Sequence, residues 1–188
     1  DNEMGKLWLD TDFEMRLTDT AGEDWFVTKS TSTSGPGDTT NRVQARNDAD
    51  ISITDATWTI LTFNQEAFDG NAFHDTAANT DRITIPAGAA GLYSILAGAA
   101  FAANATGVRG ISFQRNSTTI LFDTNTLNQL LFPTAPVTNN PIFQASAISE
   151  FSSGDFYTVW VYQNSGAPLN CAAAGDYSPG TIAARIQP

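Results

Sequence analysis

The residues of this chain best suited to acid–base chemistry are a single histidine, His74, and the aspartate that follows it, Asp75. Nucleophilic catalysis would require a serine, threonine or cysteine held against such a base. The sequence contains no Gly-x-Ser-x-Gly motif. Carboxylates are frequent enough for a glycosidase pair, but no pair stands out among the 20 acidic residues. We therefore interpret His74 as a loop histidine held by local hydrogen bonds, and we expect no enzymatic activity.

Two acidic clusters offer oxygen atoms of the kind that bind Ca²⁺. The clusters are Asp48, Asp50 and Asp55, and Asp10, Asp12 and Glu14. Neither follows the glycine-containing twelve-residue loop that is typical of a calcium site. We interpret both as solvated turn acids and predict no cofactor, with Ca²⁺ as the alternative. The only cysteine, Cys171, is interpreted as a small buried hydrophobic residue.

Composition excludes several classes of function. The 188-residue chain carries a net charge of −11, which repels nucleic-acid phosphates and anionic membranes. Without any run of 18 apolar residues, no membrane insertion is expected. Hydrophobic residues make up 41% of the chain, enough for a folded core. We therefore expect a folded protein that does not bind nucleic acid.

The chain divides by composition into three parts. Residues 1–30 alternate short apolar stretches with acidic turns, which predicts two or three short strands in a hairpin or meander. So small a sheet cannot bury its own aromatic residues, so we expect an attachment module. Residues 31–40 are rich in Ser, Thr and Gly and are predicted to be a linker. The aromatic residues of the predicted module are Trp8, Phe13, Trp25 and Phe26.

Residues 41–188 are predicted to be a β-sandwich or jelly roll with almost no helix. Period-two alternation and β-branched runs recur between Gly and Pro clusters, giving eight to ten expected strands. A long loop is expected at residues 123–141, which hold three prolines and four asparagines. The expected strands are residues 42–45, 51–53, 58–63, 82–85, 93–101, 108–113, 119–122, 143–148, 156–162 and 181–186.

The expected strand 156–162 is apolar or aromatic on both of its faces. A sandwich strand needs only one buried face. We therefore expect a second copy, the N-terminal module or the long loop to cover the other face. The alternative is a central strand that its own subunit covers completely. The residues considered for packing against a second copy or on the second face are Tyr157, Trp160 and Tyr162.

Three segments resemble the C1q/TNF-like jelly roll. In residues 81–93 a strand ends at Pro86, and Gly-Leu-Tyr opens the next strand; residues 58–64 with 73–75, and residues 153–166, resemble its neighbouring strands. Residues 101–109 and the pieces 5–11 and 22–25 are similar to structural proteins of tailed bacteriophages. Three features depart from the family: no collagen repeat precedes the domain, Asn116-Ser117 stands where Asn-Gly is usual, and the insertion 123–141 is long for the fold.

The resemblance implies a homotrimer and a non-enzymatic virion protein, such as a tail fibre, head fibre or capsid decoration protein. Residues 1–30 would then contact other virion proteins. The alternative is a secreted C1q-like lectin or adhesin. A tailspike depolymerase is the least favoured, because no carboxylate constellation is evident.

If the protein binds host-surface glycans, we expect loops to make the contacts. Aromatic rings stack on sugar faces, and amides and carboxylates bond hydroxyl groups. An equally favoured alternative is that the phenylalanines anchor their loop to the core and the asparagines are only solvated. The candidate residues are Phe68, Phe73, His74 and Asp75 in residues 66–80, and Asn125, Asn128, Gln129 and Asn139 in residues 123–141.

Overall fold

The computed structural model describes residues 7–9, 15–18, 24–26, 40–121, 123–133, 142–171 and 179–186. By its contacts the chain forms two compact units, Asp1–Asp38 and Thr39–Pro188. The described residues form strands and connecting turns and no helix, and so contain no helix that could cross a membrane.

The N-terminal unit contains a three-stranded antiparallel sheet. Strands β1 (Leu7–Leu9), β2 (Met15–Thr18) and β3 (Asp24–Phe26) pair in that order. The predicted small meander is therefore confirmed. Phe13, the side chains of the other three aromatic residues of the module and residues 31–39 of the expected linker lie outside the described residues.

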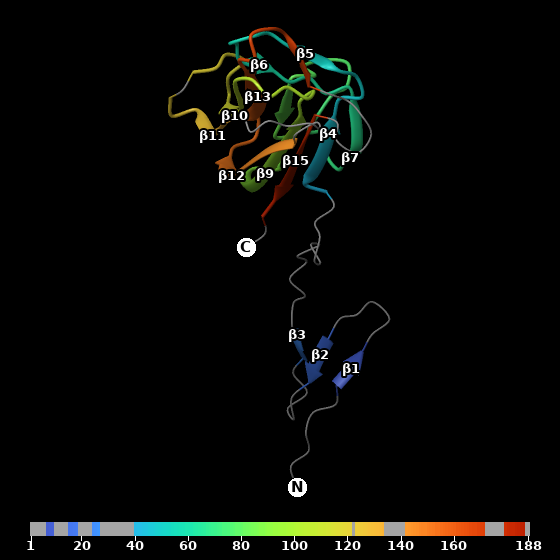
Figure 1. Ribbon diagram of the computed structural model, residues 1–188. Helices are drawn as coiled ribbons and strands as arrows, with labels where there is room; N and C mark the ends of the chain where they lie inside the picture. The colour runs from blue at the N-terminus through green and yellow to red at the C-terminus, as the bar shows by residue number, and fades with distance from the viewer. Residues whose placement is uncertain are drawn as a thin grey trace. The chain divides into compact units, whose positions relative to one another are not determined.

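The C-terminal unit is built mainly from two five-stranded antiparallel sheets (Figure 1). The first, sheet 1, has the order β12-β9-β15-β4-β7. Its strands are β12 (Ile142–Phe151), β9 (Gly91–Ala100), β15 (Gly180–Arg185), β4 (Arg42–Arg46) and β7 (Gln65–Asp69). The second, sheet 2, has the order β11-β10-β13-β6, and β8 also pairs with β13. Its strands are β11 (Thr126–Pro133), β10 (Val108–Arg115), β13 (Phe156–Gln163), β6 (Thr59–Ile60) and β8 (Arg82–Thr84). A separate pair joins β14 (Leu169–Cys171) to β5 (Ile51–Ile53).

The core lies between the two sheets because alternate residues of each strand point inward. In β9 the buried positions include Tyr93, Ile95 and Ala97, and the exposed ones lie between them. Tyr157 and Val159 of β13 are completely buried. Aromatic rings cross the core in edge-to-face or tilted contacts, an arrangement that their quadrupoles favour. The pairs are Phe73–Tyr93, Tyr93–Phe151, Phe151–Tyr157 and Phe113–Tyr157, with centroids 5.9 to 6.2 Å apart.

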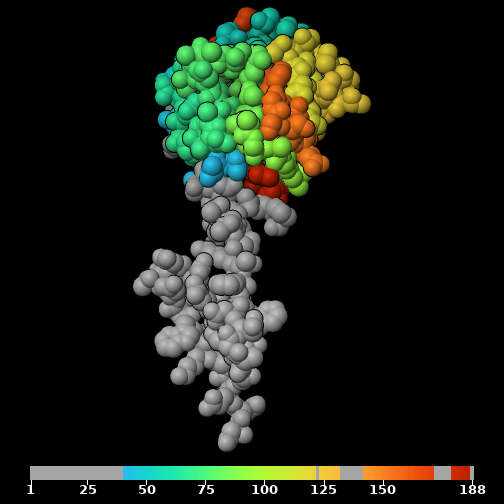
Figure 2. Space-filling view, turned by 180° about the vertical axis from the view of Figure 1, so that it is seen from behind, coloured from blue at the N-terminus to red at the C-terminus, as the bar shows by residue number. Residues whose placement is uncertain are grey.

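The two sheets approach each other along one side of the sandwich. There β11, the edge of sheet 2, lies beside β12, the edge of sheet 1, as Figure 2 shows in yellow and orange. The side-chain amide of Asn128 in β11 donates a hydrogen bond of 2.6 Å to the carbonyl oxygen of Ser146 in β12. Neither strand has a further ladder partner, so this bond helps to protect two open sheet edges.

The largest correction to the expected strands concerns residues 119–141. The expected strand 119–122 is not formed by its described residues, and the expected loop 123–141 contains β11 instead. β-propensity reflects packing more than backbone preference, and Leu127 and Leu130 of β11 pack against the core. Strands β7 and β14 were also not predicted as strands.

The segment 117–121 crosses the outward side of sheet 2. The Thr158 hydroxyl donates to the Ser117 carbonyl oxygen over 2.9 Å. The backbone N–H of Leu121 donates to Oε1 of Gln114 over 3.4 Å. Asn116, with a φ of 50°, turns the chain out of β10 into this path. We call the outward side of β10 and β13 beneath this segment the covered face.

Candidate functional site

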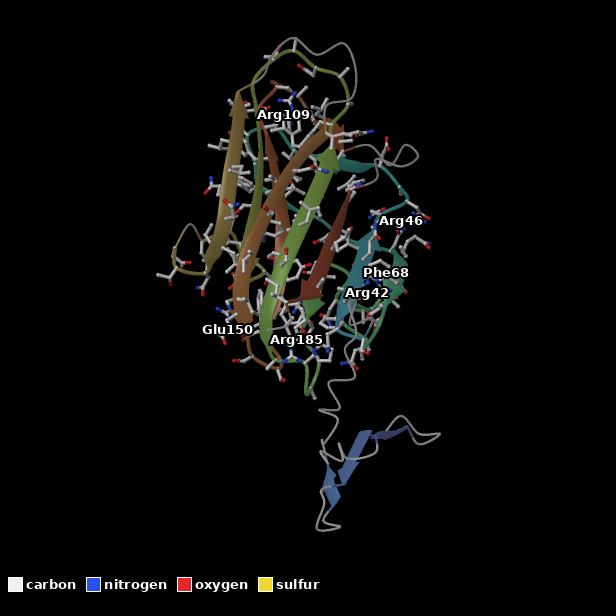
Figure 3. The ribbon with its side chains drawn as sticks, turned by 90° about the horizontal axis from the view of Figure 1, so that it is seen from below. Arg42, Arg46, Phe68, Arg109, Glu150 and Arg185 are labelled. Carbon is white, nitrogen blue, oxygen red and sulfur yellow. The ribbon has the colours of Figure 1, made fainter. Side chains whose placement is uncertain are left out.

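The phenylalanines expected in a recognition loop both pack against other residues of the domain. Phe68 lies in β7 and is half-buried, with the Arg42 guanidinium 4.7 Å from its ring centroid. Figure 3 shows Arg42, Arg46 and Phe68 near the β7 edge of sheet 1. Phe73 is buried against Tyr93 in the core. The alternative interpretation, in which the phenylalanines anchor their segment to the core, describes Phe73.

His74 is mostly buried, and with Phe73 and Asp75 it lines a hollow of about 240 Å³. Its Nδ1 lies 2.9 Å from Oε1 of Glu66, and its backbone N–H donates to Oδ2 of Asp69 over 2.8 Å. Its Nε2 is buried and has no hydrogen-bond partner in the described structure. A ring held in this way matches the local hydrogen bonding that the sequence predicted.

Asp75 is the candidate of this segment whose carboxylate reaches solvent. It accepts hydrogen bonds from the backbone N–H groups of Ala77 and Ala78, at 2.8 and 3.0 Å. These bonds lower the pKa of Asp75, because they favour its charged form. The carboxylate is thus occupied in shaping its own turn.

The second group of candidates is divided between a turn, a strand and the part of the chain outside the described residues. Asn125 lies in the turn before β11, where its backbone N–H donates to Asp123 Oδ1 over 2.8 Å. Asn128 and Gln129 lie within β11, so their assignment to a loop was wrong. Asn128 is used in the bond to Ser146. Asn139 lies outside the described residues.

The chain itself covers most of β13. Tyr157 lies in the core, where burial raises the pKa of its hydroxyl group and Thr181 Oγ1 lies 2.9 Å away. Trp160, on the covered face, is only 7% exposed and donates to Thr158 Oγ1 over 2.9 Å. For Tyr157 and Trp160, therefore, packing against a second copy is corrected in favour of burial within one subunit. Tyr162 is half-buried.

The acids of the first candidate Ca²⁺ cluster bond to three different parts of the chain. Asp48 accepts from the Asn64 amide over 2.6 Å, and Asp50 from the Asn170 amide over 3.0 Å. Asp55 accepts from the backbone N–H of Gly166. Within the described ranges, no group of three or more His, Cys, Asp or Glu residues is placed to hold a metal ion. The second cluster lies outside these ranges.

A hollow of about 380 Å³ opens beside the covered face, on the outward side of sheet 2. We call it the outer hollow. Its aromatic wall is formed by Trp58 and Tyr162, whose ring centroids are 5.3 Å apart with planes inclined by 38°. Leu131, which is 55% exposed, contributes an apolar side chain. The remaining lining residues are Val108, Gln129 and Asn164.

Gly110 allows the aromatic wall to form. It lies opposite both Leu131 and Tyr162 in the strand register. A Cβ atom at this position would lie 2.7 Å from Leu131 Cδ2 and 2.9 Å from Trp58 Cη2. Glycine within a strand often marks a close approach of another group, and here that group is the indole ring. Gly110 and Trp58 were not among the sequence candidates, although a strand glycine is the signal that points to them.

Arg109 supports the loop next to the outer hollow from inside. Its guanidinium group, almost completely buried, donates to the carbonyl oxygens of Thr106, Val108 and Asn104 over 3.0 to 3.3 Å. Burial lowers the pKa of Arg109. Figure 3 shows Arg109 at the opposite end of the sandwich from Glu150 and Arg185. By bonding these carbonyls, Arg109 holds Val108 at the edge of the hollow.

The outward side of sheet 1 presents an exposed apolar surface, which we call the open face. Leu96 of β9 lies beside Ser146 of β12 and Ile182 of β15, so apolar and small polar residues share the same cross-strand row. Ile148 is 68% exposed, the highest value among the large exposed hydrophobic residues. The large exposed hydrophobic residues of the open face are Leu92, Leu96, Ile142, Ile148 and Ile186.

Comparison with known proteins shows a likeness in structure but not in sequence. The sequence matches no protein-family model and no curated protein. Murine APRIL at pH 5.0 is 14% identical, with a TM-score of 0.55 over 77% of this chain and 98% of that chain. Eiger TNF from S. frugiperda is 9% identical, with a TM-score of 0.52 over 78% and 94%.

A further structure in this set is the globular domain of the zebrafish complement 1qA protein. It is 17% identical, with a TM-score of 0.49 over 78% of this chain and 97% of that chain. At such identities the likeness concerns the fold. The predicted fold class is confirmed: this chain is an all-β jelly roll of the C1q/TNF type with a small N-terminal β meander.

Proposed function

We propose that the chain is a non-enzymatic structural protein that assembles as a homotrimer through the open face. The observation that carries this proposal is the set of large apolar side chains on the outward side of β12, β9 and β15. A sheet face left in water is normally polar, and a contiguous exposed apolar patch marks an interaction surface. The number of three copies rests on the C1q/TNF-like resemblance.

A non-enzymatic role agrees with the state of the residues best suited to catalysis. His74 is buried and bonded to Glu66, while Asp75 is bonded to the backbone of its own turn. Their described side-chain bonds reach a carboxylate and backbone N–H groups, whereas activation of a nucleophile requires a bond to a serine, threonine or cysteine side chain.

The finer role that we propose is that of a virion component, such as a tail fibre, head fibre or capsid decoration protein. It rests on the similarity of residues 5–11, 22–25 and 101–109 to structural proteins of tailed phages. Residues 1–30 would attach the protein to other virion proteins, and the jelly roll would be displayed towards host-surface glycans.

A second candidate is a secreted C1q-like lectin or adhesin. The outer hollow favours a binding role of this kind, because it combines two aromatic rings with two side-chain amides. Both candidates share the homotrimer, and they differ in whether the protein belongs to a particle.

Self-association is tested by sedimentation equilibrium of the full chain at micromolar concentration. We expect about three times the chain mass of 20.1 kDa. A mass of one chain across the concentration range would contradict the proposal. Immunogold labelling of particles from the source tests the virion role: labelled particles support a virion component, and label found only in the particle-free fraction supports the lectin.

A further inference from the structure

We propose that the outer hollow is a binding site for one ring of a neutral sugar, a hexopyranose at the end or within the chain of a glycan. Its volume of about 380 Å³ lies near the lower end of the roughly 300–1,000 Å³ that is typical of small-molecule sites. The inference gives a location and a ligand class to the glycan-binding role proposed above, and rests on that role.

The aromatic wall provides the surface on which the apolar face of a sugar ring would lie. Trp58 and Tyr162 form one tilted pair, and both are half-buried, so each ring also presents surface to the hollow. Their large, rigid faces bind with little loss of side-chain entropy. Gly110 keeps the Trp58 ring against the strand, since any larger residue would displace it.

The polar groups of the outer hollow suit hydroxyl groups. The side-chain amide of Gln129 lines the hollow and has both donors and an acceptor. Asn164 uses Oδ1 to accept from the backbone N–H of Val108, which leaves its NH₂ group to donate. A side-chain amide donates through its nitrogen and accepts through its oxygen. A sugar hydroxyl group can also donate or accept, so it can bond to either atom of the amide.

Charge favours a neutral sugar over an acidic one. None of the lining residues that the structure describes carries a charge, and the whole chain has a net charge of −11. This charge repels sialic acids and sulfated or phosphorylated sugars. A proline-rich peptide also binds aromatic surfaces, but the two side-chain amides beside the rings suit the hydroxyl groups of a sugar.

The location of the outer hollow keeps it accessible in an assembly. It belongs to sheet 2, whereas the open face belongs to sheet 1, on the opposite side of the sandwich. Association through the open face would therefore leave one hollow available on each copy. Several weak sites on one assembly bind a multivalent glycan much more strongly than one site does.

The test uses the full chain and nuclear magnetic resonance titration with methyl glycosides of glucose, galactose, mannose and N-acetylglucosamine. We expect saturable binding of at least one of them, with shifts of the Trp58 indole signal, and no binding of sialic acid. Trp58→Ala should weaken this binding at least tenfold, and Gln129→Ala severalfold. Tyr162→Phe, which keeps the ring, should change it less than twofold.

A blocking variant covers the case in which Trp58→Ala fails to fold. Leu131→Arg places a long side chain in the hollow at a position that is already 55% exposed, and should abolish binding. Leu121→Arg is the matched control, because Leu121 is 43% exposed and does not line the hollow. This control should bind like the wild type.

Three results would overturn the proposal. They are no binding of any of the four glycosides, equal binding by the Leu131→Arg and Leu121→Arg variants, and binding at the hollow of a proline decapeptide but of no sugar. Assembly is measured separately by sedimentation. A trimer that binds no sugar would overturn this inference alone, and a monomer that binds sugar at the hollow would overturn only the assembly proposal.

Discussion

The open face and the covered face are outward sides of the two sheets of one sandwich, yet their apolar residues have opposite environments. On the covered face Trp160 is only 7% exposed within a single chain, and the segment 117–121 of that chain bonds to Thr158 and Gln114 on the same face. On the open face Ile148 is 68% exposed. Both residues point away from the core, so the alternation of side chains along a strand predicts the same environment for both.

The difference shows that an apolar outward side chain does not by itself indicate a partner. Strand β13 carries apolar or aromatic residues on both faces, and its own chain buries most of it. Strand β12 has the polar residues Gln144, Ser146 and Glu150 on its outward side, yet the apolar residues beside them are exposed. What decides the need for a partner is whether a connecting segment returns over the strand.

The largest effect is expected from a charge placed on the open face. Ile148→Asp would bury a carboxylate in the proposed subunit contact, which is strongly unfavourable. We expect the mass in sedimentation to fall from three chains to one. Leu121→Asp, the same change at an exposed leucine outside the open face, should leave the trimer intact. A trimer in both variants would show that the open face is not the contact.

The next prediction compares how much one residue of each face contributes to the free energy of unfolding of a monomer. In the Ile148→Asp background, Trp160→Ala should lower the free energy of unfolding by about 3–5 kcal/mol, the usual range for removing a buried tryptophan. Leu96→Ala, at a residue 38% exposed, should change it by about 0.5 kcal/mol or less. Urea unfolding measures both. Similar losses at the two sites would mean that the covered face is not buried within one subunit.

A smaller effect separates the two tyrosines of β13. Tyr157→Phe removes the buried hydrogen bond between the phenol and Thr181, so we expect the free energy of unfolding to fall by about 1 kcal/mol. The same substitution at half-buried Tyr162 should leave it nearly unchanged. Equal values in urea unfolding of the two variants would contradict the assignment of Tyr157 to the core.

The smallest effect is a pH dependence of stability that comes from Asp155. This carboxylate accepts a hydrogen bond from Asn116, the residue before the segment 117–121. Burial raises the pKa of Asp155, but hydrogen bonds from Asn116 and the Ser152 backbone and the nearby Arg115 more than offset it and leave the pKa below its usual value. A lowered pKa stabilises the fold above the unfolded value of about 3.9, and this contribution is lost as pH falls through the lower folded pKa.

Asp155→Asn removes this titration. We expect the stability of the variant, measured by urea unfolding between about pH 6 and pH 2, to fall less steeply with acid than that of the wild type. Parallel pH profiles would show that the carboxylate does not contribute in this way.

Local patterns in the sequence were sufficient for several elements. The period-two alternation of residues 42–45 and 156–162 predicted β4 and β13, and the short alternations of residues 1–30 predicted the N-terminal meander. Cys171 is buried, as expected of a small hydrophobic residue, and burial raises its pKa to about 12. The strand positions depend on residues close together in the chain, so they can be predicted from it, whereas the burial of Cys171 depends on contacts with distant residues.

Contacts between distant residues required the tertiary structure. The run 119–122 has strong β-propensity but does not form a strand, whereas the asparagine-rich region after it provides β11, because packing against the core decides between them. The outer hollow joins residues 58, 108, 129 and 164, which no local motif connects. The sequence by itself determined an all-β chain with two-sided strands. Only the fold decided which sides are covered, because covering depends on where a connecting segment returns in space, and periodicity along one strand carries no information about that.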